Sequence, residues 1–121
     1  MTARRWTCGL VAAALGVPAM LAPAAAHADA TAYLIGVNVR PGYNFPNADA
    51  ALGYGYGICD KVGAGQPFAQ VMGDVRADFN TDDDYQASYL ISQAVNELCP
   101  AQIWQLRKSA ARYQSPPGVH P

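Results

Sequence analysis

The first 28 residues constrain the fold most, because their pattern marks them for removal before the chain folds. Two arginines near the start precede an apolar run over residues 6–22, and the small residues Ala26 and Ala28 follow. This order of positive charge, apolar core and small side chains is typical of a secretory signal peptide. We therefore predict cleavage after Ala28, with Ala24 and Ala26 as less favoured positions, and a folded chain that begins at Asp29.

Two kinds of anchor are the alternatives to cleavage. The apolar run has about 17 residues and contains Pro18, whereas a membrane-spanning helix needs roughly 20 residues. A lipoprotein signal would place a cysteine at the cleavage point, but Cys8 lies near the start of the run. The sequence therefore predicts a protein that is secreted to the cell envelope or the extracellular space, with no transmembrane or lipid anchor after cleavage.

The remaining 93 residues are enough for one small domain. They hold six Lys or Arg and nine Asp or Glu, a formal charge of −3, which argues against nucleic acid as a partner because nucleic-acid affinity depends on neutralising phosphates. The charge is uneven, since residues 100–121 hold three basic side chains and no acidic one. This basic segment folds onto the acidic body, stays solvated, or contacts an anionic surface such as a membrane.

Two cysteines remain after cleavage, Cys59 and Cys99, in a compartment where disulfides persist. We expect them to pair, closing a loop of 41 residues that is worth roughly 4 kcal/mol in the loop-entropy model. The alternative is a catalytic or metal-binding cysteine, which needs a nearby histidine. After cleavage the only histidine is His120, in a proline-rich terminus, so we favour the structural disulfide.

Apolar residues recur at helical spacing along the chain, separated by glycine, proline and asparagine. This pattern predicts an all-α fold, a small bundle of four to five short helices, with the disulfide linking the second and fourth. The expected helices cover residues 31–39, 48–62, 67–79, 81–98 and 101–114. The domain organisation is then a signal peptide over residues 1–28, a helical disulfide-linked domain over 29–100, the C-terminal amphipathic helix over 101–114, and a disordered tail over 115–121.

Two short motifs have alternative interpretations. The glycine-rich run of residues 53–57 alternates like a phosphate-binding loop, but it lacks the preceding apolar strand and the Lys-Ser/Thr pair. We predict a helix there, in which Gly53 and Gly57 let another helix approach closely. The three aspartates after Thr81 lack the spacing of a calcium loop, and we predict that they stabilise the start of a helix that begins at Thr81.

No arrangement of residues predicts catalysis. Acyl transfer needs a nucleophile, a histidine base and an acid, and His120 lies in the predicted disordered tail. Glu97 is the only glutamate, and most aspartates lie at expected helix starts or on solvent faces. No metal-ligand spacing is present. The sequence therefore predicts a protein that is not an enzyme and that has no metal and no cofactor.

The spacing of glycines and cysteines resembles a known family. Gly55 lies four residues before Cys59, Gly65 lies six residues after it, and Cys99 is followed by Pro100. Further matching positions are Leu52-Gly53, Ile58, Val71, Val75, Ala94 and Leu98. Over about residues 30–100 the chain resembles DUF732, the small secreted domain-of-unknown-function family of mycobacteria and related actinobacteria. The resemblance implies an exported, all-helical, disulfide-linked domain, and it implies no catalytic residues.

Two functional hypotheses follow from the sequence. The first is an exported, non-enzymatic protein that acts through its surface on an unknown protein or envelope component. Tyr, Trp and Arg are common at the centres of protein interfaces, so the candidate contacts are Tyr54, Tyr56, Trp104, Arg107, Lys108 and Arg112. The second is a small carrier or binding protein for an apolar ligand, because glycine and alanine positions leave space between helices unless the helices pack tightly.

Overall fold

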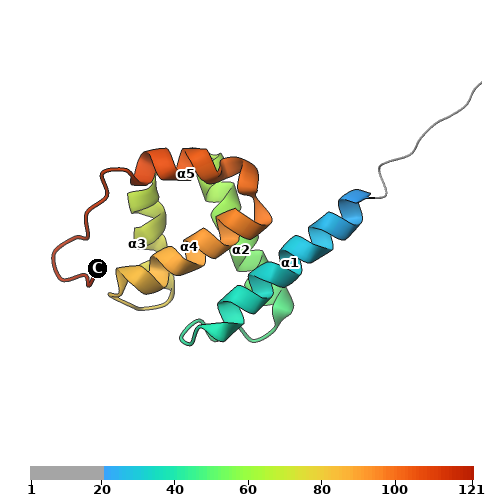
Figure 1. The fold of residues 1–121 in the computed structure, drawn as a ribbon. Coiled ribbons are helices and arrows are strands. Elements are labelled where there is room, and N and C mark those ends of the chain that lie inside the picture. The colour runs from blue at the N-terminus through green and yellow to red at the C-terminus, as the bar shows by residue number, and fades with distance from the viewer. Residues whose placement is uncertain (1–20) are drawn as a thin grey trace, which may run out of the picture.

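A computed structural model describes the backbone of residues 21–121 and the side chains of residues 29–121 (Figure 1). The helices, in chain order, are α1 (Leu21–Val39), α2 (Ala48–Gly63), α3 (Phe68–Asp78), α4 (Asp84–Leu98), the 3-10 turn η2 (Pro100–Gln102) and α5 (Ile103–Ala110). No strand occurs over residues 21–121, where the one β-bridge joins Asp83 to His120. The all-α prediction is therefore confirmed. The first 20 residues of the predicted signal peptide lie outside the described residues, and its cleavage stays a prediction.

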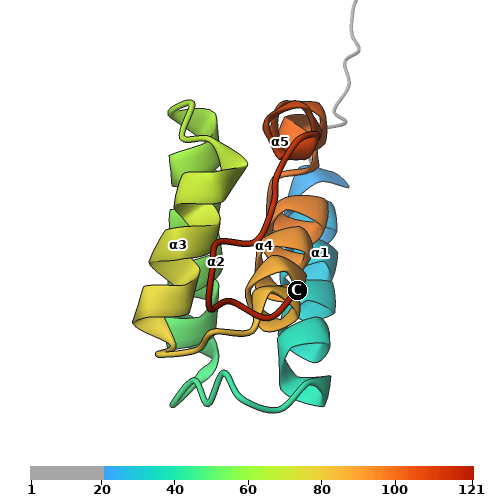
Figure 2. The ribbon, with the colours of Figure 1, turned by 90° about the vertical axis from the view of Figure 1, so that its left-hand side faces the viewer.

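Helix α4 is the centre of the bundle, and it contacts α1, α2 and α3. Figure 2 shows α2 and α3 in one layer and α1 and α4 in the other, with α5 across one end. The face of α4 that points inward is made of small and branched apolar residues that are fully buried, namely Ala87, Leu90, Ile91, Ala94 and Val95. Because this face contacts three helices, α4 holds the largest share of the buried core.

The helix ends follow local capping chemistry. Asn47 begins α2 by accepting a hydrogen bond from the Ala50 amide through its side chain, at 2.8 Å. Gly65, with a φ of 90°, and Asn80, with a φ of 49°, follow α2 and α3 in the left-handed conformation. In both places the next amide bonds back to a carbonyl in the last turn, from Gln66 to Lys61 and from Thr81 to Arg76. These are Schellman ends, which turn the chain sharply into the next helix.

The residue that caps the start of α4 differs from the predicted one. Thr81 does not begin the helix; Asp83 is the N-cap, and its carboxylate accepts hydrogen bonds from the amides of Tyr85 and Gln86. Thr81 instead accepts a hydrogen bond from the Asp83 amide at 3.1 Å. The physical reason is that Asp83 has extended backbone geometry, which places its side chain over the free amides of the first turn.

The predicted close approach at Gly53 and Gly57 is wrong. Another helix approaches α2 closely at Gly55 instead. A Cβ atom on Gly55 would lie 2.6 Å from Leu98 Cδ1 and 2.7 Å from Tyr33 Cζ, whereas nothing lies within 4 Å of a Cβ atom on Gly53 or Gly57. Tyr33 is fully buried, and its hydroxyl donates a 2.8 Å hydrogen bond to the Ala51 carbonyl. Gly55 therefore makes room for the Tyr33 ring between α1 and α2.

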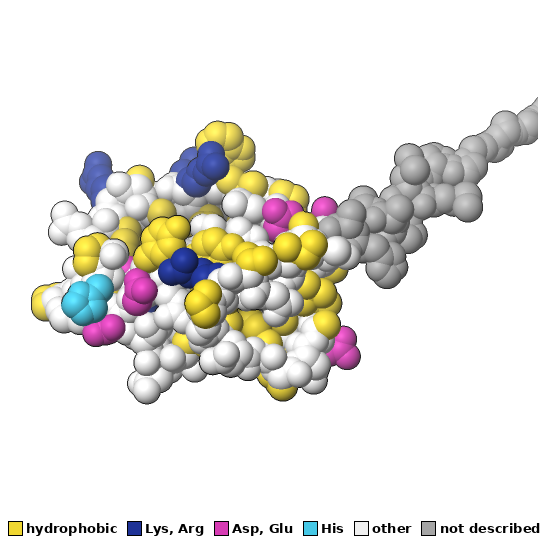
Figure 3. Space-filling model, turned by 60° about the horizontal axis from the view of Figure 1, so that its bottom comes forward, with side chains coloured by type: hydrophobic (Ala, Val, Ile, Leu, Met, Phe, Trp, Pro, Cys, Tyr) yellow, Lys and Arg dark blue, Asp and Glu magenta, His cyan; other side chains and the backbone are white. Residues whose placement is uncertain are grey.

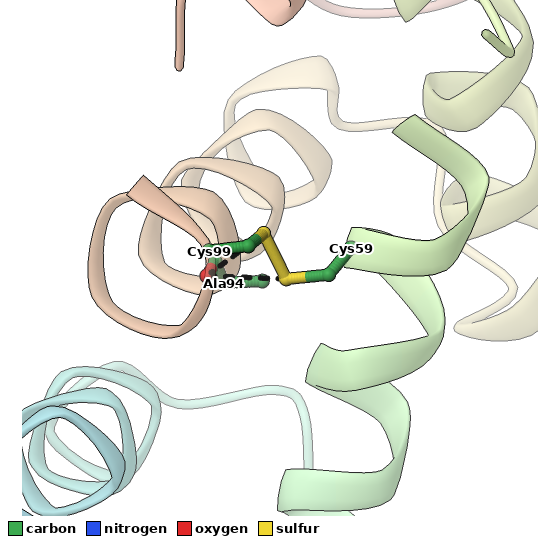
Figure 4. The surroundings of a disulfide bond; sticks show 3 residues. All are labelled: Cys59, Ala94 and Cys99. Atoms are coloured by element: carbon green, nitrogen blue, oxygen red, sulfur yellow. Dashed lines mark hydrogen bonds between the residues drawn. A yellow bond between two sulfur atoms is a disulfide. The ribbon is translucent and has the colours of Figure 1, made fainter. Parts of the chain in front are cut away.

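The disulfide joins Cys59 in α2 to Cys99, the residue that directly follows α4 (Figure 4). The two Cα atoms lie 6.0 Å apart, within the usual range for a disulfide. Both sulfur atoms also lie near the carbonyl oxygen of Ala94, at 3.7 and 3.9 Å. The predicted pairing of the second and fourth helices is therefore present in the fold, and it fixes the C-terminal end of α4 against α2.

Candidate functional site

Helix α5 and the residues directly after it hold four of the six predicted contact residues. Trp104 is 70% exposed, and the Arg107 guanidinium lies 5.4 Å from its ring centroid, within cation–π distance. Lys108 is exposed, as is Arg112 two residues beyond the end of the helix. Over residues 29–121 these three cations form no ion pair. We call Trp104, Arg107, Lys108 and Arg112 the α5 surface. Figure 3, in which the bottom of Figure 1 comes forward, shows dark-blue cationic side chains beside yellow hydrophobic ones along its upper edge.

The opposite side of α5 holds the helix firmly on the bundle. Ile103 and Leu106 pack against the core. The Gln105 side chain donates a hydrogen bond to the Val62 carbonyl, and the Ser109 hydroxyl accepts one from the Phe68 amide at 3.0 Å. The basic segment therefore docks through apolar and uncharged polar contacts rather than by charge attraction, and its cations remain directed to solvent.

The two tyrosines of α2 lie in different environments. Tyr56 is 46% exposed, as its predicted role as a surface contact requires. Tyr54 is only partly exposed, because its ring packs against Phe79 and Phe45, with centroids 5.2 and 5.8 Å away, and its hydroxyl donates to Asp78 at 2.7 Å. Tyr54 therefore belongs mainly to the packing between α2 and α3, and only part of its side chain is accessible for the predicted surface contact.

Tyr54 is part of an aromatic cluster that closes one end of the bundle. Phe79 lies at its centre, with edge-on contacts to Tyr43 at 5.4 Å and to Phe45 at 5.7 Å. Tyr43 is buried, and burial is the main reason that its pKa is raised to about 12. The cluster fixes the loop between α1 and α2 to the end of α3, because aromatic rings in edge-on contact stabilise one another beyond their buried area.

A buried charged network, which no sequence pattern predicted, joins α3, α4 and the C-terminal segment. Asp84 is 5% exposed, and its Oδ1 atom accepts a hydrogen bond from Arg76, whose side chain is 14% exposed. The other carboxylate oxygen, Oδ2, accepts hydrogen bonds from the Tyr113 hydroxyl at 2.6 Å and the Ser115 hydroxyl at 2.5 Å. Arg76 also donates to the Tyr113 oxygen at 3.0 Å.

The network holds Asp84 in its charged form. Burial works to raise the pKa of Asp84, but the hydrogen bonds from Ser115, Tyr113 and Arg76 outweigh it and hold the pKa below its ordinary value. The pKa of Tyr113 is raised, first by burial and then by its hydrogen bond to the Asp84 carboxylate. Of the three aspartates, Asp83 caps α4 as a helix start requires, but no sequence signal marks Asp84 as the buried one.

The last residues, predicted as a disordered tail, pair with the start of α4 through backbone hydrogen bonds. The Asp84 amide donates to the His120 carbonyl, and the His120 amide donates to the Asp82 carbonyl, both at 2.7 Å. This is the parallel bridge between Asp83 and His120, and Figure 2 shows the C-terminal segment running down beside α3 and α4 to reach it. Proline prevents a helix here but leaves an extended chain that pairs with free backbone groups.

Three hollows on the surface of residues 29–121 open to solvent. One of about 590 Å³ is lined mainly by polar residues at the end of α3, including Arg76 and Asn80. A second, about 220 Å³ and mostly apolar, lies between α3, α4 and the C-terminal segment. A third, about 210 Å³, lies between α1 and the start of α2. Between α1 and α2, the space at Gly55 is filled by Tyr33 and Leu98, so this glycine provides no room for a carried ligand.

Two further features of the described residues concern metal binding and membrane crossing. Over the described residues, no three His, Cys, Asp or Glu side chains lie close enough together to hold a metal ion. His120 is exposed and lies 3.6 Å from the Asp82 carboxylate. None of the helices within residues 21–121 combines the length and the apolar character that crossing a membrane requires.

Comparison with known protein families identifies the family of this chain. The model of the family described as "Protein of unknown function (DUF732)" matches residues 28–101. No curated protein and no solved structure matches the chain. The match covers α2, α3 and α4 completely, both cysteines and most of α1, and it ends before α5. Since it spans more than half of the sequence, the chain belongs to the DUF732 family of proteins of unknown function.

Proposed function

We propose that this protein is exported and acts without catalysis, through contact of the α5 surface with an anionic partner in the cell envelope or outside the cell. The observation that carries the proposal is the exposure of Trp104 beside Arg107 on a helix that has no acidic residue. Tryptophan and arginine dominate the binding energy of many protein interfaces. A partner protein or an envelope component with negative charge fits this surface.

The rigidity of α5 supports the proposal. The helix is held by packing of Leu106 and by the hydrogen bonds of Gln105 and Ser109, so the contact residues are positioned before a partner arrives. Binding then loses less conformational entropy than binding by a flexible segment would. The uneven charge adds to this, because unpaired cations on one helix attract an anionic partner over about a Debye length.

The predicted signal peptide supports the exported location, and mass spectrometry tests it. The protein is purified from the medium and from the envelope fraction of a host that secretes it, and its intact mass is recorded before and after reduction. We expect a chain that begins at Asp29 and gains two hydrogens on reduction. A full-length mass confined to the cell interior would contradict export.

Site-specific crosslinking tests the contact surface. A photoreactive amino acid is placed at exposed Ala111, beside the α5 surface, in an otherwise wild-type chain and in a Trp104→Ala/Arg107→Ala variant, and crosslinked species are counted in the secreting host. We expect the variant to lose the crosslinked species, because two of the central contacts are gone. The matched control is Val39→Ser, which changes a 71% exposed apolar residue on α1. Equal crosslinking in the Trp104→Ala/Arg107→Ala variant and the control would rule out the α5 surface.

Salt dependence separates a charge contact from an apolar one. If the cations contribute as proposed, the yield of crosslinked partner falls as salt is raised from low to about 0.5 M, since exposed charges are screened over a few ångströms there. An unchanged yield across this range would remove anionic chemistry from the proposal and leave Trp104 as the main contact.

A further inference from the structure

We propose that the groove between α3 and α4 is a binding site for an extended peptide of a partner protein, and that the C-terminal segment is its built-in, displaceable occupant. We call residues 111–121 the strap and the surface beneath it the strap groove. The groove is lined by Phe68, Met72, Asp84, Tyr85 and Ser88. None of these lining residues belongs to the α5 surface, and Arg112 is the one residue that the strap shares with that surface. The proposal therefore rests on other contacts than the proposed function does.

The strap is bound as a peptide ligand would be. Its backbone pairs with Asp82 and Asp84 through two hydrogen bonds at His120, in the manner of a strand added to a free edge. Two residues of its earlier part insert side chains: Tyr113 packs edge-on against Phe68, with ring centroids 5.0 Å apart, and Ser115 bonds to Asp84. Backbone pairing and side-chain insertion together are the two components of peptide recognition.

Asp84 sets the chemistry that the groove selects. The Oδ2 atom of Asp84 accepts two hydrogen bonds, and both donors, Tyr113 and Ser115, belong to the strap. When the strap leaves, this oxygen loses two donors, and water or the hydroxyl groups of another peptide must replace them. A replacing peptide therefore needs a tyrosine and, two residues later, a serine or threonine, followed by an extended segment that pairs with the start of α4.

The fit of the strap leaves room for a better ligand. An apolar hollow of about 220 Å³ remains between the strap and the helices, lined on the strap side by Tyr113, Ser115 and Pro121. The apolar groups that line this open hollow face water, so a peptide with a larger apolar side chain at this place would remove more apolar surface from water than the strap does. Most residues of the strap beyond Ser115 are exposed, which favours local opening.

The extent of the family match supports a built-in occupant. Arg76, Asp84, Phe68 and Met72 all lie within the matched residues 28–101, whereas the strap lies beyond them. The groove is thus part of the family domain, and in this chain a segment outside the matched domain fills it. An extension that covers a surface of its own domain is the arrangement expected of an intramolecular competitor.

Peptide competition in the full chain tests the proposal. The probe is a fluorescently labelled synthetic peptide of residues 111–121, and the readout is its anisotropy on titration with protein. In wild-type protein the strap competes with the probe. In a Tyr113→Phe/Ser115→Ala variant the strap has lost both bonds to Asp84, so we expect the apparent affinity for the probe to rise about tenfold or more.

Two controls define the result. A Gln114→Ala variant changes the exposed residue between the two bonding positions, and we expect it to bind the probe as wild type does. A probe that carries the same changes, Tyr113→Phe and Ser115→Ala, is expected to bind the strap variant about tenfold less tightly than the unmodified probe does. Equal binding of the two probes, or equal affinity of the variant and wild type, would overturn the proposal.

Amide hydrogen exchange in the wild-type chain provides a test that does not depend on a variant. The Asp84 amide is at the start of α4, where no carbonyl of the helix can bond to it, and the His120 carbonyl is its acceptor. We expect the Asp84 and His120 amides to exchange at least about tenfold faster than the core amide of Leu90, since opening the strap breaks few contacts. Exchange as slow as that of Leu90 would show that the strap leaves only on global unfolding and would overturn displaceability. Concentration-dependent dimerisation that protects Asp84 would assign the groove to the strap of a second copy instead of a partner.

Discussion

Of three glycine-to-alanine substitutions in α2, we expect two to stabilise the protein and one to destabilise it. Alanine replaces glycine at positions 53, 55 and 57 of α2, each in the oxidised protein. In a helix interior this exchange stabilises by about 0.5–1 kcal/mol where there is space for a methyl group. Because nothing lies within 4 Å of a new Cβ atom at Gly53 or Gly57, we expect both variants to gain this amount.

Gly55→Ala is expected to destabilise instead. The new methyl group would lie 2.7 Å from Tyr33 Cζ and 2.9 Å from the Tyr33 hydroxyl. Leu98 can rotate its terminal methyl group away, but Tyr33 is fully buried and bonded to the Ala51 carbonyl. Overpacking costs about 1–3 kcal/mol, and a weakened buried hydrogen bond costs about 1 kcal/mol more. After the helix gain is subtracted, the net loss is about 1–3 kcal/mol.

Thermal unfolding followed by far-ultraviolet circular dichroism measures the three effects. A change of 1 kcal/mol shifts the Tm of a domain of this size by about 4–8 °C. Gly55→Ala therefore lowers Tm by roughly 4–20 °C, and the other two variants raise it by a few degrees. A Gly55→Ala variant as stable as wild type, or destabilisation of similar size at Gly53 or Gly57, would refute the assignment of close approach to Gly55.

Three further perturbations follow from the structure. Replacing Cys59 and Cys99 by alanine lowers the free energy of unfolding by up to about 4 kcal/mol, and equal Tm values for oxidised and reduced wild-type protein would contradict this. The pKa of Asp84 is lowered in the folded protein. The stability that its carboxylate contributes is therefore complete above the unfolded pKa of about 3.9 and is lost as pH falls through the folded pKa. In urea unfolding from pH 7 to 2.5, we expect the free energies of unfolding of wild type and Asp84→Asn to converge as pH falls below about 4. Phe79→Ala removes the centre of the aromatic cluster and costs about 2–4 kcal/mol in urea unfolding, whereas the exposed Val39→Ala stays within about 0.5 kcal/mol of wild type.

Part of the site was predictable because it depends on composition and local spacing. Exposure of Trp104, Arg107 and Lys108 follows from their position on the side of α5 opposite Leu106, which the helical period alone defines. The Asp84 network was not predictable in this way. It joins Arg76, Asp84 and Tyr113, which are separated by up to 37 residues, and polar residues at such distances carry no periodic signal.

The sequence by itself determined the number and type of the helices and the pairing of Cys59 with Cys99. It also determined the start of α2 after Asn47 and the turns at Gly65 and Asn80. Each depends on neighbouring residues or on the count of cysteines, so no knowledge of the packing is needed. Only the tertiary structure decided that Gly55 receives the Tyr33 ring, that Asp84 is buried, and that the last residues form the strap. These depend on which faces of distant segments meet, and packing against distant side chains overrides the local preferences that a sequence pattern reports.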